Sequence, residues 1–151
     1  MGSRSPFTAA TTSPFDLARR QRAALLLSIQ AVERALARPI AEPGWRQGAA
    51  ESLNWMVEAF ADHVSVTEGA DGLYAELLDH APRLARGVYV LTREHAALSR
   101  AMDAVVQRVS GGDPDNLRVW ASDLLRELAR HRQSGADLVY EAYQTDIGGE
   151  T

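Results

Sequence analysis

Apolar side chains recur every three or four residues along most of the chain, which is the spacing of an amphipathic helix. No segment alternates apolar and polar residues as a half-buried strand does. Proline and glycine interrupt the helical pattern at a few places, with Asp16 suited to cap the first helix. The segments so defined predict an all-α, up-down-up-down four-helix bundle. The expected helices cover about 16–37, 45 up to the turn "HAPRL", 82–109 and 116–144.

Length and composition fit one globular domain. The chain has 151 residues, of which 46% are hydrophobic and 24% are charged. We expect residues 1–14, rich in Ser, Thr and Pro, to form a disordered tail. The bundle is expected over residues 15–147, followed by a frayed C-terminus at 148–151. No apolar stretch is long enough for a signal peptide or a membrane span, so a cytoplasmic protein is expected.

Charge and cysteine content exclude several chemistries. The net charge of −4 does not favour a nucleic acid as partner. The chain contains no cysteine, which excludes disulfides, thiolate metal sites and a cysteine nucleophile. Any metal site must therefore use His, Asp, Glu or Tyr side chains.

Three of the four histidines interrupt apolar stripes that should face the core. The third predicted helix carries His95 among seven apolar residues at helical spacing, and His63 and His131 hold similar places on the second and fourth helices. His80 lies beside the Pro82 turn and off any stripe. The stripe of the third helix is Leu84, Val88, Leu91, His95, Leu98, Met102, Val105 and Val109.

The three histidines should also lie at the same depth. In an up-down bundle, residues equally far from a shared turn share a level. The midpoint of His95 and His131 is residue 113, within "SGGDPDN", and the midpoint of His63 and His95 is residue 79, near "HAPRL". Both midpoints fall on predicted turns. For His63 and His95 to share a level, the second helix must continue in distorted form through "TEGADGLYAELL".

Three buried imidazoles at one level favour a metal site, because without a metal they need several partners. Histidine and carboxylate sites in bundle cores typically hold iron or manganese, and zinc is an alternative. Among the carboxylates we rank Glu68 first, if the helix is distorted after it, and Glu127 second. Asp137 follows His131 by six residues, which is poor spacing, and Glu94 should point away from the cluster because it is adjacent to His95.

The stretches "DHVSVTEGADGLYAELLDHAPRL", "LTREHAAL" and "LARHRQSGADLVYEAY" resemble the hemerythrin-like, or HHE cation-binding, domain family over roughly residues 16–147. The resemblance implies an up-down four-helix bundle with a non-haem di-iron centre of five histidines and two bridging carboxylates. It also implies His63, His95 and His131 as ligands. Glu68 and Asp137 each lie one residue after the family carboxylate position, where this chain has Thr67 and Ala136.

This chain departs from the family pattern at two further ligand positions. The first-helix histidine is absent, and its level corresponds to "RRQR" at residues 19–22. The second histidine of the third helix is also missing. We expect at least one of Arg19 and Arg22 at the histidine level, paired with Glu68 or Asp137, because a buried guanidinium needs an anionic partner. The arginines are therefore candidates for cofactor binding, and the metal site should be a reduced one.

The leading hypothesis is a hemerythrin-like protein that binds, senses or reacts with dioxygen, peroxide or nitric oxide, with non-haem iron, mononuclear or dinuclear, as the expected metal. An oxidase or peroxide-handling activity is compatible with it. One alternative is a metal-free bundle that binds haem or an organic anion with the histidines and arginines. Another is a structural, partner-binding bundle that uses Trp45, Trp55 or Trp120.

Overall fold

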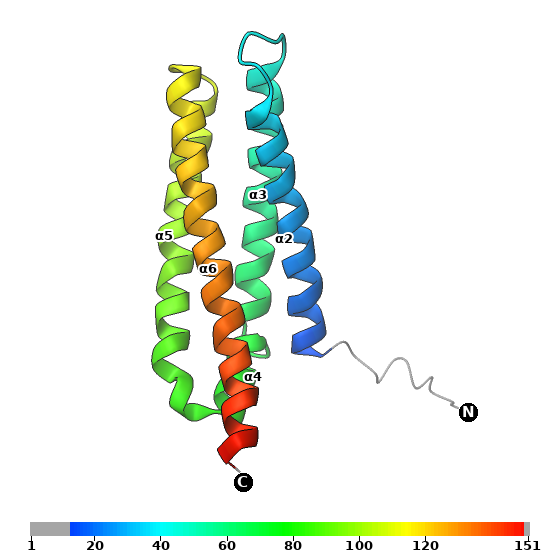
Figure 1. Cartoon of the computed structure of the whole chain (residues 1–151), viewed down its shortest axis with the longest axis vertical. Helices are drawn as coiled ribbons and strands as arrows, with labels where there is room; N and C mark the ends of the chain where they lie inside the picture. Colours follow the sequence, from blue (N-terminus) through cyan, green and yellow to red (C-terminus); the bar gives the residue numbers. More distant parts are fainter. Residues whose placement is uncertain (1–12, 150–151) are drawn as a thin grey trace, which may run out of the picture.

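The computed structural model describes residues 13–149, and the side chains of residues 13–143. Four long helices lie side by side and alternate in direction (Figure 1), with a short helix at one end. Within this range there is no strand, so the expected all-α four-helix bundle is confirmed. No helix in the described range is apolar over enough residues to span a bilayer. The elements are α2 (Pro14–Ala37), α3 (Trp45–Glu68), α4 (Leu73–His80), η1 (Pro82–Leu84), α5 (Ala85–Val109) and α6 (Pro114–Gly149).

The ends of the first and last helices differ from the expected ones. Ser13, not Asp16, caps α2, and its hydroxyl accepts a hydrogen bond from the Asp16 amide at 3.1 Å. Pro14 then occupies the first helical turn, where its missing N–H costs nothing. α6 continues to Gly149, beyond the expected end at Gln144. Glycine lowers helix propensity by about 1 kcal/mol, but it does not terminate a helix as proline does. The expected tail at 1–14 lies almost entirely outside the described residues.

The second helix is interrupted where the histidine arithmetic required a distortion. α3 ends at Glu68, and α4 begins at Leu73 after a tight turn. The Gly72 amide donates to the Gly69 carbonyl at 2.8 Å. A Cβ atom on Gly72 would lie 2.6 Å from the Val66 carbonyl oxygen and 2.9 Å from that of Thr67. The turn therefore requires glycine at position 72, and it leaves Glu68 as the last residue of α3.

The histidine layer divides the core into two parts. The larger part lies toward the α5–α6 loop and includes Leu98 and Leu128, whereas the smaller part lies at the other end and includes Leu91 and Ala142. His95 on α5 and His131 on α6 fall between these residues in sequence and are themselves buried. The cluster is therefore a polar layer between two apolar layers.

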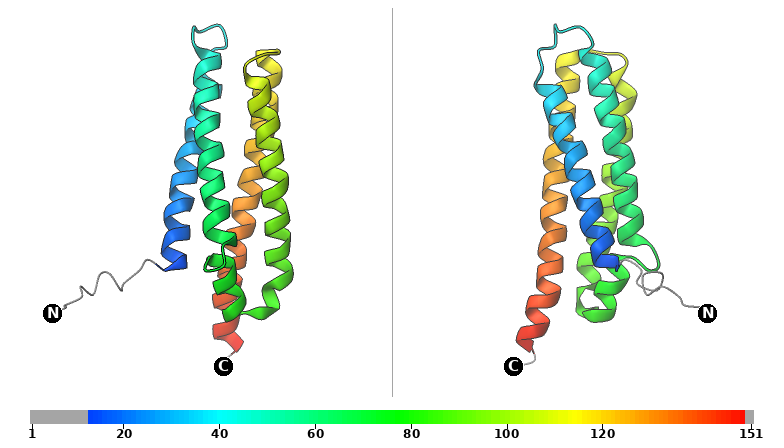
Figure 2. Two further views of the ribbon diagram at one scale, coloured as in Figure 1. Left: turned by 180° about the vertical axis from the view of Figure 1, so that it is seen from behind. Right: turned by 90° about the vertical axis from the view of Figure 1, so that its right-hand side faces the viewer.

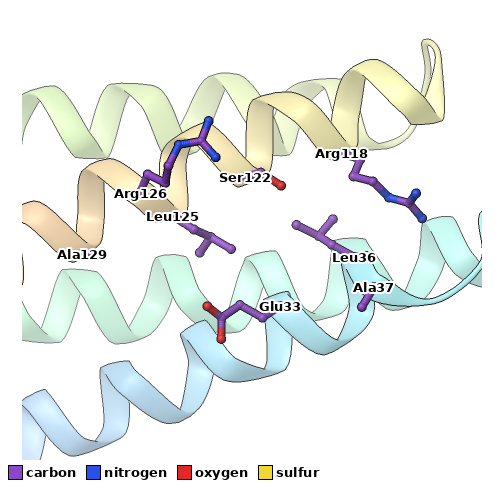
Figure 3. A pocket seen from close by; sticks show the side chains of 8 residues that line it. All are labelled: Glu33, Leu36, Ala37, Arg118, Ser122, Leu125, Arg126 and Ala129. Atoms are coloured by element: carbon purple, nitrogen blue, oxygen red, sulfur yellow. The ribbon is translucent and has the colours of Figure 1, made fainter.

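The bundle is less tightly closed between α2 and α6 than elsewhere. α2 packs mainly on α3, and α6 mainly on α5 (Figure 2). A groove of about 500 Å³ separates the two helices, with Leu36 and Leu125 at its centre and Glu33 beside them (Figure 3). The residues that line it include no histidine, so the groove is not part of the site described next.

Candidate metal centre

Three helices bring one imidazole each to a common point. His63 from α3, His95 from α5 and His131 from α6 each offer one ring nitrogen, and these nitrogen atoms all lie within 4.8 Å of one another. The Nε2 atoms of His63 and His95 are 3.2 Å apart. His95 and His131 are buried, and His63 is half-buried. The convergence expected from the two midpoints is therefore present in the structure.

Two carboxylates hold the outer sides of two of these rings. Nδ1 of His95 is 2.5 Å from Oε2 of Glu68, and Nδ1 of His131 is 2.6 Å from Oε1 of Glu94. In each pair the Nδ1–H group donates to the carboxylate, which leaves the Nε2 lone pair directed away from it. Carboxylates in this position commonly orient metal-binding histidines and raise their basicity.

Aromatic side chains enclose the imidazoles. Phe60, one turn before His63, packs against all three rings, with centroid distances of 5.7, 5.6 and 6.3 Å. The Tyr74 hydroxyl from α4 lies 3.3 Å from Nε2 of His95, and it donates to that nitrogen when Nδ1 carries the proton. The α3–α4 turn therefore supplies the cluster with Glu68 on one side and with Tyr74 on the other.

The surroundings keep the imidazoles of His63 and His95 neutral. Burial lowers the pKa of His63 to about 3, with further contributions from His95, His131 and the charges of Arg22 and Arg132. Burial and His131 lower the pKa of His95 to about 4, against the opposing charge of Glu94. Burial raises the pKa of Tyr74 above its ordinary value. Neutral imidazoles with free lone pairs at neutral pH are the form that binds metal ions.

A small cavity of about 70 Å³ adjoins the histidines. His63, His131, Thr67 and Tyr74 line it together with apolar side chains such as Leu25 and Leu91. Two arginines, Arg22 from α2 and Arg132 from α6, complete the lining. The cavity is therefore largely apolar, with its polar groups gathered at the imidazoles and the arginines.

The other predicted carboxylates do not reach the cluster. Glu127 is exposed and has no ion pair among the described residues. Residues four apart on a helix differ by about 40° in direction, and this offset carries Glu127 out of the core. Asp137 is exposed, and it accepts a hydrogen bond from Gln133 at 2.8 Å. Glu68 does approach the cluster, but at Nδ1 of His95 and not at the centre of the three nitrogen atoms.

The arginines also lie differently from the expected arrangement. Arg19 is exposed and forms a 3.6 Å ion pair with Asp16, so it takes no part in the site. Arg22 does line the cavity at the histidine level, but it pairs with neither Glu68 nor Asp137. Glu68 is not available to it, because His95 already binds that carboxylate.

Sequence reasoning missed Glu94. A residue adjacent to His95 points about 100° away from it around the helix, and that direction leads toward α6 and not toward the bundle centre. Glu94 consequently meets Nδ1 of His131 on the neighbouring helix. Its position along the bundle axis could have indicated this contact. His95 and His131 lie at the same level, so a carboxylate one residue from His95 is level with His131 as well.

The donor set fits one metal ion better than two. Two nitrogen atoms bound to a tetrahedral metal at about 2.0 Å lie roughly 3.3 Å apart. The 3.2 Å separation of the His63 and His95 nitrogens already matches this value. The positions at which the family places bridging carboxylates hold Thr67 and Ala136, which supply no charged oxygen. The Thr67 hydroxyl instead donates to the His63 carbonyl at 2.8 Å.

Comparison with known proteins agrees with this geometry. The family model of the Hemerythrin HHE cation binding domain matches residues 14–142, which covers α2 through most of α6. Searches of curated proteins and of solved structures gave no match. The matched segment includes all three histidines and both carboxylates that hold them. The chain belongs to the hemerythrin HHE cation-binding domain family.

Proposed function

We propose that the protein binds one metal ion through His63, His95 and His131 and uses it to bind, sense or react with dioxygen, peroxide or nitric oxide. The observation that carries the proposal is the convergence of three ring nitrogens within 4.8 Å. The carboxylates of Glu68 and Glu94 support it, because they place the proton of two of the three rings on Nδ1 and leave Nε2 as the ligand atom.

Iron is the metal that we expect first, with manganese and zinc as alternatives. Family membership supports iron, while three imidazoles also suit manganese and zinc. A bound iron or manganese ion would supply redox chemistry or Lewis acidity, with coordination positions left open by a set of only three protein ligands. A single ion is proposed because Thr67 and Ala136 replace the bridging carboxylates.

The chain's own residues suit a small ligand. The cavity of about 70 Å³ admits a diatomic molecule or peroxide beside the imidazoles. Its apolar walls limit the entry of water. The Tyr74 hydroxyl, already at His95, is placed to donate a hydrogen bond to a ligand held there. An oxidase or peroxide-handling activity is part of the same proposal, with Tyr74 as the nearest donor.

The alternatives have less support. The cavity is far smaller than the several hundred Å³ of typical sites for larger organic ligands, so haem does not fit it without rearrangement. Trp45 is buried, and the guanidinium of Arg108 lies 4.8 Å over the ring of Trp120. Trp55 is 45% exposed, but nothing indicates a partner for it.

The test begins with metal content. Protein purified without chelator should contain iron, manganese or zinc, or take up close to one equivalent of iron(II) under anaerobic conditions. The His63→Ala variant should lose this uptake, whereas His80→Gln, outside the cluster, should retain it. Iron-loaded protein should then change its absorption spectrum with nitric oxide, dioxygen or peroxide. Absence of uptake, or equal uptake by His63→Ala, would refute the proposal, and two irons per chain would refute the single-ion site.

A further inference from the structure

We propose that the cavity beside the three histidines is also an anion site, in which Arg22 and Arg132 bind a small planar oxyanion, such as formate or nitrite, next to the metal. The inference rests on the proposed function for the position of the metal, and it adds a ligand class that the histidines alone do not indicate. Its evidence is the position, the partners and the charge of the two arginines.

Both arginines lack an acceptor in the part of the chain that the structure describes. Arg22, which is exposed, and Arg132, which is half-buried, enter the cavity lining from α2 and α6. Neither forms a hydrogen bond or ion pair with a described residue, and Nε of Arg132 is buried without a partner. By contrast, Arg46 donates to the Val109 carbonyl at 2.9 Å. A buried N–H without an acceptor costs about 1–3 kcal/mol, so the cavity favours a ligand that accepts hydrogen bonds.

Among the described residues, neither nearby carboxylate forms an ion pair with these arginines. Glu68 is bound to His95 and Glu94 to His131. Arg22 and Arg132 line the same cavity as His63 and His131. The two arginines thus bring two positive charges to the cavity lining. An anion there would offset the repulsion between the arginines and a metal cation.

Size and shape narrow the class of anion. A water molecule takes about 30 Å³ of liquid volume. A cavity of about 70 Å³ has roughly twice this volume, which limits an anion to a few heavy atoms. The planar guanidinium group matches planar oxyanions through two parallel hydrogen bonds. Formate and nitrite meet both conditions, and the small volume of the cavity excludes longer carboxylates.

Metal and anion should bind with positive coupling. Because coupling between two ligands is reciprocal, formate should tighten metal binding by the same factor by which the metal tightens formate binding. Zinc is a suitable probe because it has no redox chemistry of its own. Its affinity can be measured by competition with a chromophoric chelator, with and without formate or nitrite.

The comparison needs four substitutions in the full chain. Arg22→Gln and Arg132→Gln remove the proposed contacts, whereas Arg20→Gln and Arg130→Gln remove exposed arginines that do not line the cavity. Formate should tighten zinc binding at least about fivefold in the unaltered protein and in both controls. The effect should disappear in the two cavity variants. Arg22→Lys should retain part of it, since it keeps the charge but not the planar fork.

The outcomes separate this inference from the proposed function. If zinc binds with the same affinity with and without either anion, or if the cavity variants respond like the controls, the anion site is refuted while the metal site stands. If the protein takes up neither zinc nor iron(II), the proposed function fails. The anion site is then decided by an NMR titration of the metal-free protein with formate, in which binding must depend on Arg22 and Arg132. An absence of such binding refutes it.

Discussion

At the scale of single residues, the site depends on the carboxylates behind the imidazoles as much as on the imidazoles. The Glu68 side chain is 31% exposed, yet its Oε2 atom contacts a His95 ring that is 2% exposed. Glu94 has the same relation to His131. A carboxylate on the outer face of each ring selects the tautomer whose lone pair faces the other histidines. The rings of His95 and His131 are therefore oriented in the metal-free protein.

Removing the charge of either carboxylate should weaken metal binding without unfolding the protein. For Glu68→Gln and for Glu94→Gln we expect a loss of zinc affinity of about 10- to 100-fold, because the amide no longer fixes the Nδ1–H tautomer or raises the basicity of the ring. Chelator competition measures the affinity, and circular dichroism checks the fold. Glu127→Gln, which alters an exposed carboxylate away from the cluster, should bind zinc like the unaltered protein. Equal zinc affinities in all three variants would show that Glu68 and Glu94 do not orient the histidines for metal binding.

The sequence was sufficient for the histidines but not for their partners. His63, His95 and His131 replace apolar residues within helical stripes. The stripes can be recognised even when the predicted helix ends are wrong by one or two residues. Which side chain meets Nδ1 depends on the rotation of α5 relative to α6 and on side-chain rotamers. The hydrophobic periodicity determines neither quantity. The expectation that Glu94 points away from the cluster was therefore wrong.

At the scale of elements, the α3–α4 turn determines the composition of the site. It ends α3 at Glu68, directly after the buried Thr67, and starts α4 so that Tyr74 reaches His95. The glycines in "TEGADGLY" predicted an irregular segment here, because an unbroken helix would direct Glu68 about 140° away from His63. They did not predict that the segment would be a full break with a separate helix after it.

Substitution of Gly72 tests the turn. Gly72→Ala would place a Cβ atom 2.6 Å from the Val66 carbonyl oxygen, and a backbone atom cannot move aside as a flexible side chain can. We expect the free energy of unfolding to fall by about 1–3 kcal/mol. Zinc affinity should fall as well, because the shifted turn carries Glu68 and Tyr74 with it. Urea denaturation and chelator competition measure the two effects.

Gly48 provides the matched control. It lies within α3, and a Cβ atom there would have no neighbour within 4 Å. Gly48→Ala should therefore stabilise the protein by about 0.5–1 kcal/mol through helix propensity and leave zinc affinity unchanged. If Gly72→Ala behaved like Gly48→Ala, the turn would not have the tight geometry on which the position of Glu68 depends.

At the scale of the whole molecule, the three histidines occupy a layer of the core that apolar side chains would otherwise fill. Replacing an apolar layer by three imidazoles costs stability unless each polar group is paired. The bundle limits this cost with the two outer carboxylates, with Tyr74 and with the packing of Phe60 against all three rings. The bundle itself was predictable because four long amphipathic segments have few other ways to bury their apolar faces. The cavity and its two arginines were only partly predictable, since they depend on how closely α2 approaches α6.

The buried imidazoles should make the metal-free protein sensitive to acid. The unfolded chain binds protons at histidine near the ordinary pKa of 6.5, whereas the folded protein keeps His63 and His95 neutral down to about pH 3 and 4. The unfolded state therefore holds more protons below pH 6.5, and the free energy of unfolding must fall as the pH falls. Each of the two imidazoles contributes about 1.4 kcal/mol per pH unit well below 6.5. Urea denaturation at a series of pH values between 7 and 5 measures the slope, and replacing His63 by Gln should reduce it.

Metal affinity should respond to pH in a different way from stability. A metal ion competes with protons only where the folded protein binds them, and for His63 and His95 this begins near pH 4. These two histidines should therefore contribute little to any change in zinc affinity between pH 7 and 5, although the same change in pH destabilises the metal-free fold. The imidazole proton resonances of His63 and His95 should likewise show no titration in this range. Resonances of His63 or His95 that titrate near pH 6.5 would mean that water reaches these two imidazoles freely and that the bundle does not enclose them.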